Sequence, residues 1–202
     1  MRATMLLPVG LAAGCFTLIP ATGSADDNGR IRVDLSGFHE VQVVPGPPAA
    51  VLGAIFSTGN GQLTLKINKQ SREIAYELTY AFPDAAATPI AGTQFVNQAH
   101  LHFGQKHTTG AINVWLCQSA DSPAPAAVAT STPMCPSPSG TVTGSITPAK
   151  ILALAGQGFP AGEAGFDALL DAIQTGAIYG NVHTDRFPSG EIRGQVGDHG
   201  HD

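Results

Sequence analysis

The sequence feature that most constrains the fold is a series of short segments in which apolar and polar residues alternate between glycine- and proline-rich turns. Gln62–Ile67 alternates in this way, and Ile74–Tyr80 does the same after a turn at Asn68–Ser71. Because successive side chains of a strand point to opposite faces, this period predicts half-buried strands. Similar patterns predict further strands at Ile31–Leu35, Ala50–Ser57, Gln98–Phe103, Ala111–Cys117, Gly140–Ile146, Ile178–Thr184 and Glu191–Val196. So many short strands predict an all-β fold, mainly an antiparallel, Greek-key-like β-sandwich.

Helical signals interrupt the strand pattern before the last hairpin. Thr147 followed by Pro148 is typical of an N-cap and a first helical position, and predicts a short helix to about Ala155. Gly176 then follows an apolar stripe with helical spacing, formed by Phe166, Leu169, Leu170 and Ile173. We therefore expect a helical insertion that packs this stripe over one end of the sandwich.

The first 25 residues have the pattern of a secretory signal peptide. Arg2 supplies a positive charge, Met5–Pro20 is apolar, and Ala21–Ala25 supplies small residues at the cleavage positions. We therefore predict cleavage after Ala25 and a secreted or periplasmic protein. A lipoprotein anchored at Cys15 is the alternative, although the usual leucine three residues before that cysteine is absent.

The remaining chain is predicted to form one domain, residues 26–197, followed by a disordered tail, residues 198–202. No second apolar run is long enough to cross a membrane. Ten Lys and Arg stand against 15 Asp and Glu, a net charge of −5, and the basic residues do not cluster along the sequence. This balance argues against nucleic acid and anionic membranes as partners, so the expected partner is an unknown protein or extracellular ligand.

Two cysteines remain after the predicted cleavage, Cys117 and Cys135. An even pair in an exported protein predicts a disulfide. The enclosed segment, residues 118–134, is rich in Pro, Ala, Ser and Thr, so it buries little apolar surface, and closing it stabilises the fold by about 3 kcal/mol. The alternative is a pair of metal-binding thiolates, which needs more ligands than this segment offers.

Three histidines on two of the predicted strands suggest a functional site. The i, i+2 spacing of His100 and His102 places both on one strand face, and His183 lies on a later strand. Three imidazoles on two rigid strands suit copper or zinc, which both accept nitrogen ligands, so we predict that these residues converge on a candidate metal site. The alternative is a buried polar network in which the histidines bond to the backbone or to Asn181, Thr184 and Glu191.

The motifs also occur in a distinctive order: Leu35–Gly37, then Glu40–Pro45, an apolar hairpin, Ala-His-Leu-His-Phe-Gly with Gly110 after it, and Tyr-Gly-Asn-Val-His-Thr with Pro-Ser-Gly-Glu-Ile-Arg-Gly-Gln. This order resembles the CHRD domain, the module named for its repeats in chordin and found in secreted bacterial proteins. The resemblance covers roughly residues 30–197, nearly all of the mature chain. It implies that both histidine-bearing strands belong to the domain, and it implies no particular reaction.

Glu191 and Arg193 are two residues apart on the last predicted strand. One interpretation makes Glu191 an acceptor that orients a metal-binding imidazole. The other is an internal ion pair that fixes the strand after the turn at Pro188–Gly190. We predict no catalytic residues, because no carboxylate pair for acid–base chemistry and no serine-nucleophile motif is visible.

Taken together, these patterns predict a secreted, non-catalytic CHRD-type module that binds a partner or has a structural role. The alternative function is that of a small copper- or zinc-binding metalloprotein, for metal handling or redox chemistry, that uses His100, His102 and His183 as ligands.

Overall fold

The computed structural model describes residues 29–44, 50–84 and 95–197 of the 202-residue chain. The predicted signal peptide, residues 1–25, and the predicted disordered tail, residues 198–202, lie outside the described residues. Among the residues described, no helix is both long and apolar enough to cross a membrane.

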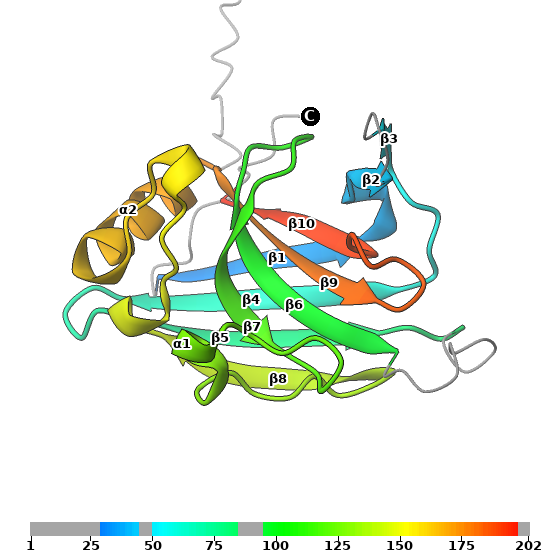
Figure 1. Cartoon of the computed structure of the whole chain (residues 1–202), viewed down its shortest axis with the longest axis horizontal. Coiled ribbons are helices and arrows are strands. Elements are labelled where there is room, and N and C mark those ends of the chain that lie inside the picture. The colour runs from blue at the N-terminus through cyan, green and yellow to red at the C-terminus, as the bar shows by residue number, and fades with distance from the viewer. Residues whose placement is uncertain (1–28, 45–49, 85–94, 198–202) are drawn as a thin grey trace, which may run out of the picture.

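The described chain is built mainly from antiparallel strands, as predicted (Figure 1). Eight strands form one sheet in the order β7-β6-β9-β10-β1-β4-β5-β8. Their bounds are β1 Arg30–Ser36, β4 Asn60–Asn68, β5 Glu73–Ala81, β6 Val96–Phe103, β7 Ala111–Cys117, β8 Ser139–Ile146, β9 Ile178–Thr184 and β10 Ile192–Val196. A separate two-stranded sheet pairs β2, Gln42–Val44, with β3, Ala50–Gly53.

The large sheet curves until its two edge strands, β7 and β8, contact each other, so that the sandwich is nearly closed into a barrel (Figure 1). Alternate residues of each strand fill its interior, including Leu63 and Leu65 of β4, Leu101 of β6 and Val182 of β9, none of which is exposed. The period-two pattern of the sequence therefore separates an apolar inner face from an outer face that carries the polar residues.

Helix α2, Gly162–Gln174, lies at one end of the barrel and the β2–β3 sheet lies toward the opposite end (Figure 1). The predicted stripe of α2 is buried, with Phe166 and Leu169 fully inaccessible. Gly176 has φ +66°, the left-handed conformation expected after a helix C-terminus. The all-β fold with a helix before the last hairpin is thus confirmed.

The prediction of one continuous helix from Thr147 to about Ala155 is wrong. The segment contains two short 3-10 helices instead, η3 at Pro148–Lys150 and η4 at Ala155–Gln157. Between them, the N–H of Leu152 donates to the Asn113 carbonyl, and the Leu152 carbonyl accepts from Asn113 Nδ2. Both backbone groups of Leu152 are bound to strand β7, so they cannot take part in an α-helix.

The predicted strand from Ala50 to Ser57 is also shorter than expected. Strand β3 ends at Gly53, which has φ +86°. Beyond it, the Ile55 N–H donates to the Gly37 carbonyl, so the chain turns toward the short 3-10 helix η1, Gly37–His39, instead of continuing beside β2.

The disulfide between Cys117 and Cys135 is present, as predicted. The enclosed loop is more ordered than its composition suggested, since it contains a short helix, α1, at Ala126–Ala129. The Gln118 side chain donates to two loop carbonyls and accepts from a loop N–H, while Val128 packs against Trp115. The loop is therefore held by side-chain contacts as well as by the disulfide.

Candidate metal centre

The three predicted histidines come from two strands that pair with each other. Strands β6 and β9 are antiparallel, with His100 opposite Asn181 and His102 opposite Tyr179, and His183 is opposite Gln98. Since Leu101 and Val182 fill the barrel core, the strand alternation places the histidines on the outer face of the sheet. They are nevertheless only 0–6 % exposed.

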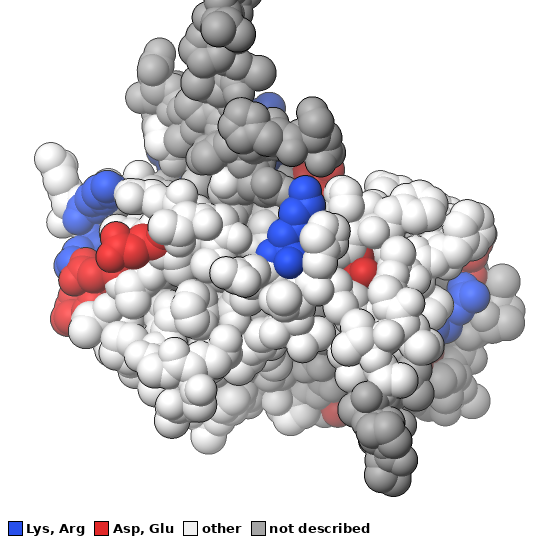
Figure 2. Space-filling view, turned by 90° about the horizontal axis from the view of Figure 1, so that it is seen from above, with Lys and Arg blue, Asp and Glu red and all other residues white. Residues whose placement is uncertain are grey.

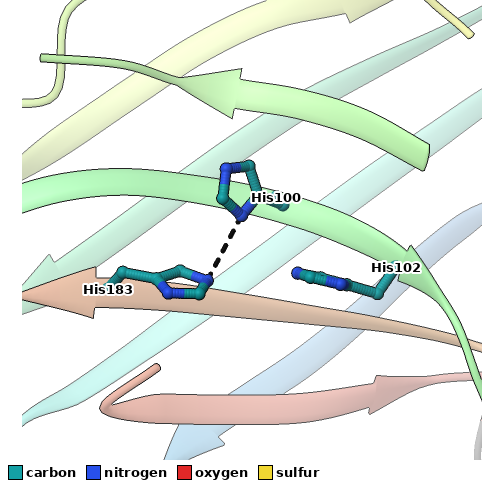
Figure 3. Close-up of side chains that lie close together, drawn as sticks. All are labelled: His100, His102 and His183. Atoms are coloured by element: carbon teal, nitrogen blue, oxygen red, sulfur yellow. Dashed lines mark hydrogen bonds between the residues drawn. The ribbon is translucent and has the colours of Figure 1, made fainter. Parts of the chain in front are cut away.

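The structure brings the three imidazoles together in one place (Figure 3). One ring nitrogen from each of His100, His102 and His183 lies within 4.8 Å of the other two. His100 Nδ1 and His183 Nε2 are closest, at 3.2 Å. Nitrogens about 2.0 Å from a common metal ion are about 3 to 4 Å apart, so the separation of this pair meets that spacing.

Backbone carbonyls determine which nitrogen of two of these rings carries the hydrogen. His102 Nδ1 lies 3.0 Å from the Gly110 carbonyl, and His183 Nδ1 lies 2.9 Å from the Pro188 carbonyl. A carbonyl only accepts, so Nδ1 of each ring is the donor and Nε2 of each ring carries a lone pair. Among the described residues, His102 Nε2 has no hydrogen-bond partner. This is the arrangement in which metal-binding histidines are usually held.

All three rings are held in their neutral form at pH 7. Burial lowers the pKa of both His102 and His183 to about 4. Burial also lowers the pKa of His100, and the charges of His183 and His102 add to the effect. A neutral imidazole is the form that binds metal, so no proton has to be removed before these rings can act as ligands.

Aromatic side chains fix the orientation of two rings. His102 stacks on Tyr179, with ring centroids 4.6 Å apart and planes 4° apart. His100 meets Trp115 edge to face, with centroids 4.3 Å apart. The contact between Trp115 and His100 depends on the pairing of β6 with β7, which places the two residues opposite each other.

Glu40 is a buried carboxylate that the sequence analysis did not assign to the site, although it lies in a motif of the family. It is 4 % exposed, its Oε1 accepts the N–H of Val41, and it interacts with the Asn181 amide. Burial raises the pKa of Glu40, against the opposing effects of Val41, Arg193 and Asn181. A Cβ at Gly190 would collide with Glu40 Oε2 and lie 2.8 Å from Asn181 Nδ2, so glycine is needed for this approach.

The other predicted network residues have separate partners. Glu191 accepts hydrogen bonds from Ser57 and Thr184, at 2.6 and 2.5 Å, and is not joined to Arg193. Arg193 instead donates to the carbonyls of Thr108 and Gln105. The interpretation of Glu191 and Arg193 as an ion pair is therefore wrong, because Glu191 binds Ser57 and a residue of β9, whereas Arg193 binds the loop after β6.

An antiparallel β-domain with an enclosed cluster of three neutral histidines on its outer face defines an all-β protein with a candidate transition-metal centre. The model of the CHRD domain family matches residues 31–196, which is most of the chain. The protein therefore belongs to the CHRD domain family, as its motif order indicated. Neither the comparison with curated proteins nor the comparison with solved structures found a match.

Proposed function

We propose that this protein is a non-catalytic CHRD module, exported from the cytoplasm, that binds one copper or zinc ion through His100, His102 and His183. The observation that carries the proposal is the fixed tautomer of two rings. Because Gly110 and Pro188 take the Nδ1 hydrogens, His102 and His183 both present Nε2 lone pairs within the same buried cluster. Three neutral nitrogens without a thiolate suit zinc and copper.

Enclosure of the cluster supports a binding role over turnover. The three histidines are at most 6 % exposed, and His100 and His102 are covered further by Trp115 and Tyr179. Three histidines leave one coordination position of a zinc ion without a protein ligand, and the burial of the cluster limits the access of a substrate to that position. The disulfide supports an oxidising compartment outside the cytoplasm, where such pairs persist.

Metal analysis of the purified protein tests this proposal. Metal-depleted protein is titrated with Zn²⁺, Cu²⁺ and, under reducing conditions that spare the disulfide, Cu⁺. We expect one equivalent of at least one ion to bind the wild type, and His102→Gln to lose it. His39→Gln is the matched control, because His39 is exposed in η1 and lies outside the cluster. A wild type that binds none of the three ions stoichiometrically would show the proposal to be wrong.

A structural network is the second candidate role, favoured by the hydrogen bond between His100 and His183. Under this alternative the rings cross-link β6 and β9 without a metal ion. His102→Gln would then leave metal content unchanged and lower the free energy of unfolding by about 1 to 3 kcal/mol, since the Gly110 carbonyl loses its donor. Urea denaturation of the same two variants separates the two roles.

A further inference from the structure

A small pocket that the sequence patterns did not indicate lies beside strands β1 and β10. Its volume is about 220 Å³. Its lining includes Arg32 of β1, Arg193 of β10, His39, and Lys106 and His107 of the loop after β6, with Asp34 as the acidic member. A drug-sized ligand usually occupies about 300–1,000 Å³, so this pocket suits a smaller ligand.

The charge of the lining is opposite to that of the protein. Three of the ten lysines and arginines of a chain with net charge −5 line this one pocket. On the face seen in Figure 2, most of the described surface is neither basic nor acidic. Among the described residues of the lining, the only carboxylate is that of Asp34, which accepts a hydrogen bond from Gln62 at 3.0 Å. The pocket is therefore a local basic site on an acidic protein.

Arg193 is a buried cation with neutral hydrogen-bond partners. It is 2 % exposed and donates to the carbonyls of Thr108 and Gln105 and to Gln195 Oε1, at 2.7, 3.1 and 3.3 Å. Burial lowers the pKa of Arg193, and Tyr179 and the charge of Glu40 oppose this effect. The Arg193 guanidinium carbon also lies 3.4 Å from the centroid of the Tyr179 ring. An arginine guanidinium stays charged in proteins, so Arg193 holds a fixed positive charge at the wall of the pocket.

The loop after β6 is held over the pocket by the same arginine. Because Gln105 and Thr108 give their carbonyls to Arg193, the two residues between them, Lys106 and His107, are kept at the rim. His107 has φ +64°, a left-handed conformation that is uncommon for residues other than glycine. Such strain persists where the surrounding structure enforces it, and it is concentrated at binding sites.

We propose that this basic pocket binds a small oxyanion group, phosphate or sulfate, either free or carried on a small molecule. Arg32 and Lys106 supply the accessible charge, and Arg193 supplies a fixed positive potential at the wall. Several acceptor oxygens on one compact group match several donors that converge from separate strands and a loop. None of the lining residues belongs to the histidine cluster, although Arg193 lies over the Tyr179 ring that stacks on His102.

Titration of the metal-free wild type with inorganic phosphate and sulfate, followed by NMR, tests the pocket at low ionic strength, with chloride at matched ionic strength as reference. We expect saturable shifts at the pocket residues with phosphate or sulfate and not with chloride. The double variant Arg32→Gln/Lys106→Gln should bind at least about tenfold more weakly, because it loses two charged donors. Lys69→Gln, in the exposed turn between β4 and β5, removes a charge elsewhere and should change affinity less than about twofold.

A sugar phosphate titrated in parallel distinguishes a free ion from a carried group. Equal affinities for phosphate and the sugar phosphate mean that the pocket recognises the free oxyanion. Tighter binding of the sugar phosphate means that the pocket also holds the attached group. The proposal is wrong if phosphate and sulfate shift the spectrum no more than chloride does, or if Lys69→Gln weakens binding as much as the double variant does.

Discussion

Asn181 Oδ1 lies 3.1 Å from His183 Nε2 in the outer face of strand β9. Because His183 gives its Nδ1 hydrogen to Pro188, both of these facing atoms are acceptors. Two acceptors at this distance repel each other unless a donated hydrogen or a positive ion lies close to both, and in the metal-free protein His100 Nδ1, 3.2 Å from His183 Nε2, supplies the hydrogen. The Asn181 amide also interacts with Glu40, so its oxygen is turned toward the histidines while its nitrogen lies near Glu40. Asn181 therefore connects the buried carboxylate of Glu40 to His183 of the candidate metal centre.

Glu40→Gln should weaken the binding of a divalent ion by about tenfold to 100-fold, as is usual for partners that orient the ligands of a metal ion. Glutamine preserves the size of the side chain but removes the negative charge and weakens its hold on Asn181. Affinity is measured by competition with a chelator of known strength. Glu77→Gln is the matched control, because Glu77 is an exposed carboxylate on β5. Equal affinities of Glu40→Gln and the wild type would contradict this role of Glu40.

The stability of the metal-free protein should depend on pH through His102 and His183. Their pKa of about 4 in the folded protein lies below the ordinary value of 6.5, so the unfolded chain binds more protons between these values. The contribution of these rings is therefore fully present above pH 6.5 and is lost as the pH falls to about 4. The expected slope is about 1.4 kcal/mol per pH unit for each histidine.

Urea denaturation across this pH range measures the slope. His102→Gln should remove the contribution of one histidine to this slope. A wild type whose free energy of unfolding is constant between about pH 6.5 and 4 would contradict the burial of neutral rings.

Local patterns were enough to predict the parts of the fold and site that depend on local geometry. The period of two along β6 placed His100 and His102 on one face, because that period needs no knowledge of neighbouring strands. The apolar stripe of α2 and the glycine after its C-terminus could also be predicted, because both depend on local helical spacing. The prediction of a helix after Thr147 was wrong, because the backbone of Leu152 forms hydrogen bonds with Asn113. This contact is distant in the sequence, so local helix propensity does not predict it.

The buried position of Glu40 and the basic pocket could not be predicted from the sequence, because both depend on contacts between distant segments. Glu40 approaches Asn181 only because η1 passes over the outer face of the sheet, beside Gly190. The basic pocket joins Arg32, Lys106 and Arg193, which are far apart in a chain whose basic residues do not cluster along the sequence. Tertiary contacts of this kind appear only after the strand order and register are known.

Removal of the disulfide should lower the free energy of unfolding by about 3 kcal/mol, because the unfolded chain gains the conformational entropy of an open loop. The double variant Cys117→Ser/Cys135→Ser is compared with the wild type by urea denaturation. The contacts of Gln118 with the loop should keep α1 in place, so the circular dichroism spectrum of the folded variant should match that of the wild type. An unchanged unfolding midpoint would show that the loop is held by these contacts alone.

Leu170→Asp should destabilise the whole domain by several kcal/mol, because it places an unpaired carboxylate in the core cluster under α2. Leu170 is 8 % exposed and belongs to the apolar stripe of the helix. Ala164→Asp introduces the same charge on an exposed position of the same helix, and should change stability by less than about 0.5 kcal/mol. Thermal and urea denaturation of both variants measure the difference. If Leu170→Asp melts with the wild type, α2 does not contribute to the cooperative core of the barrel.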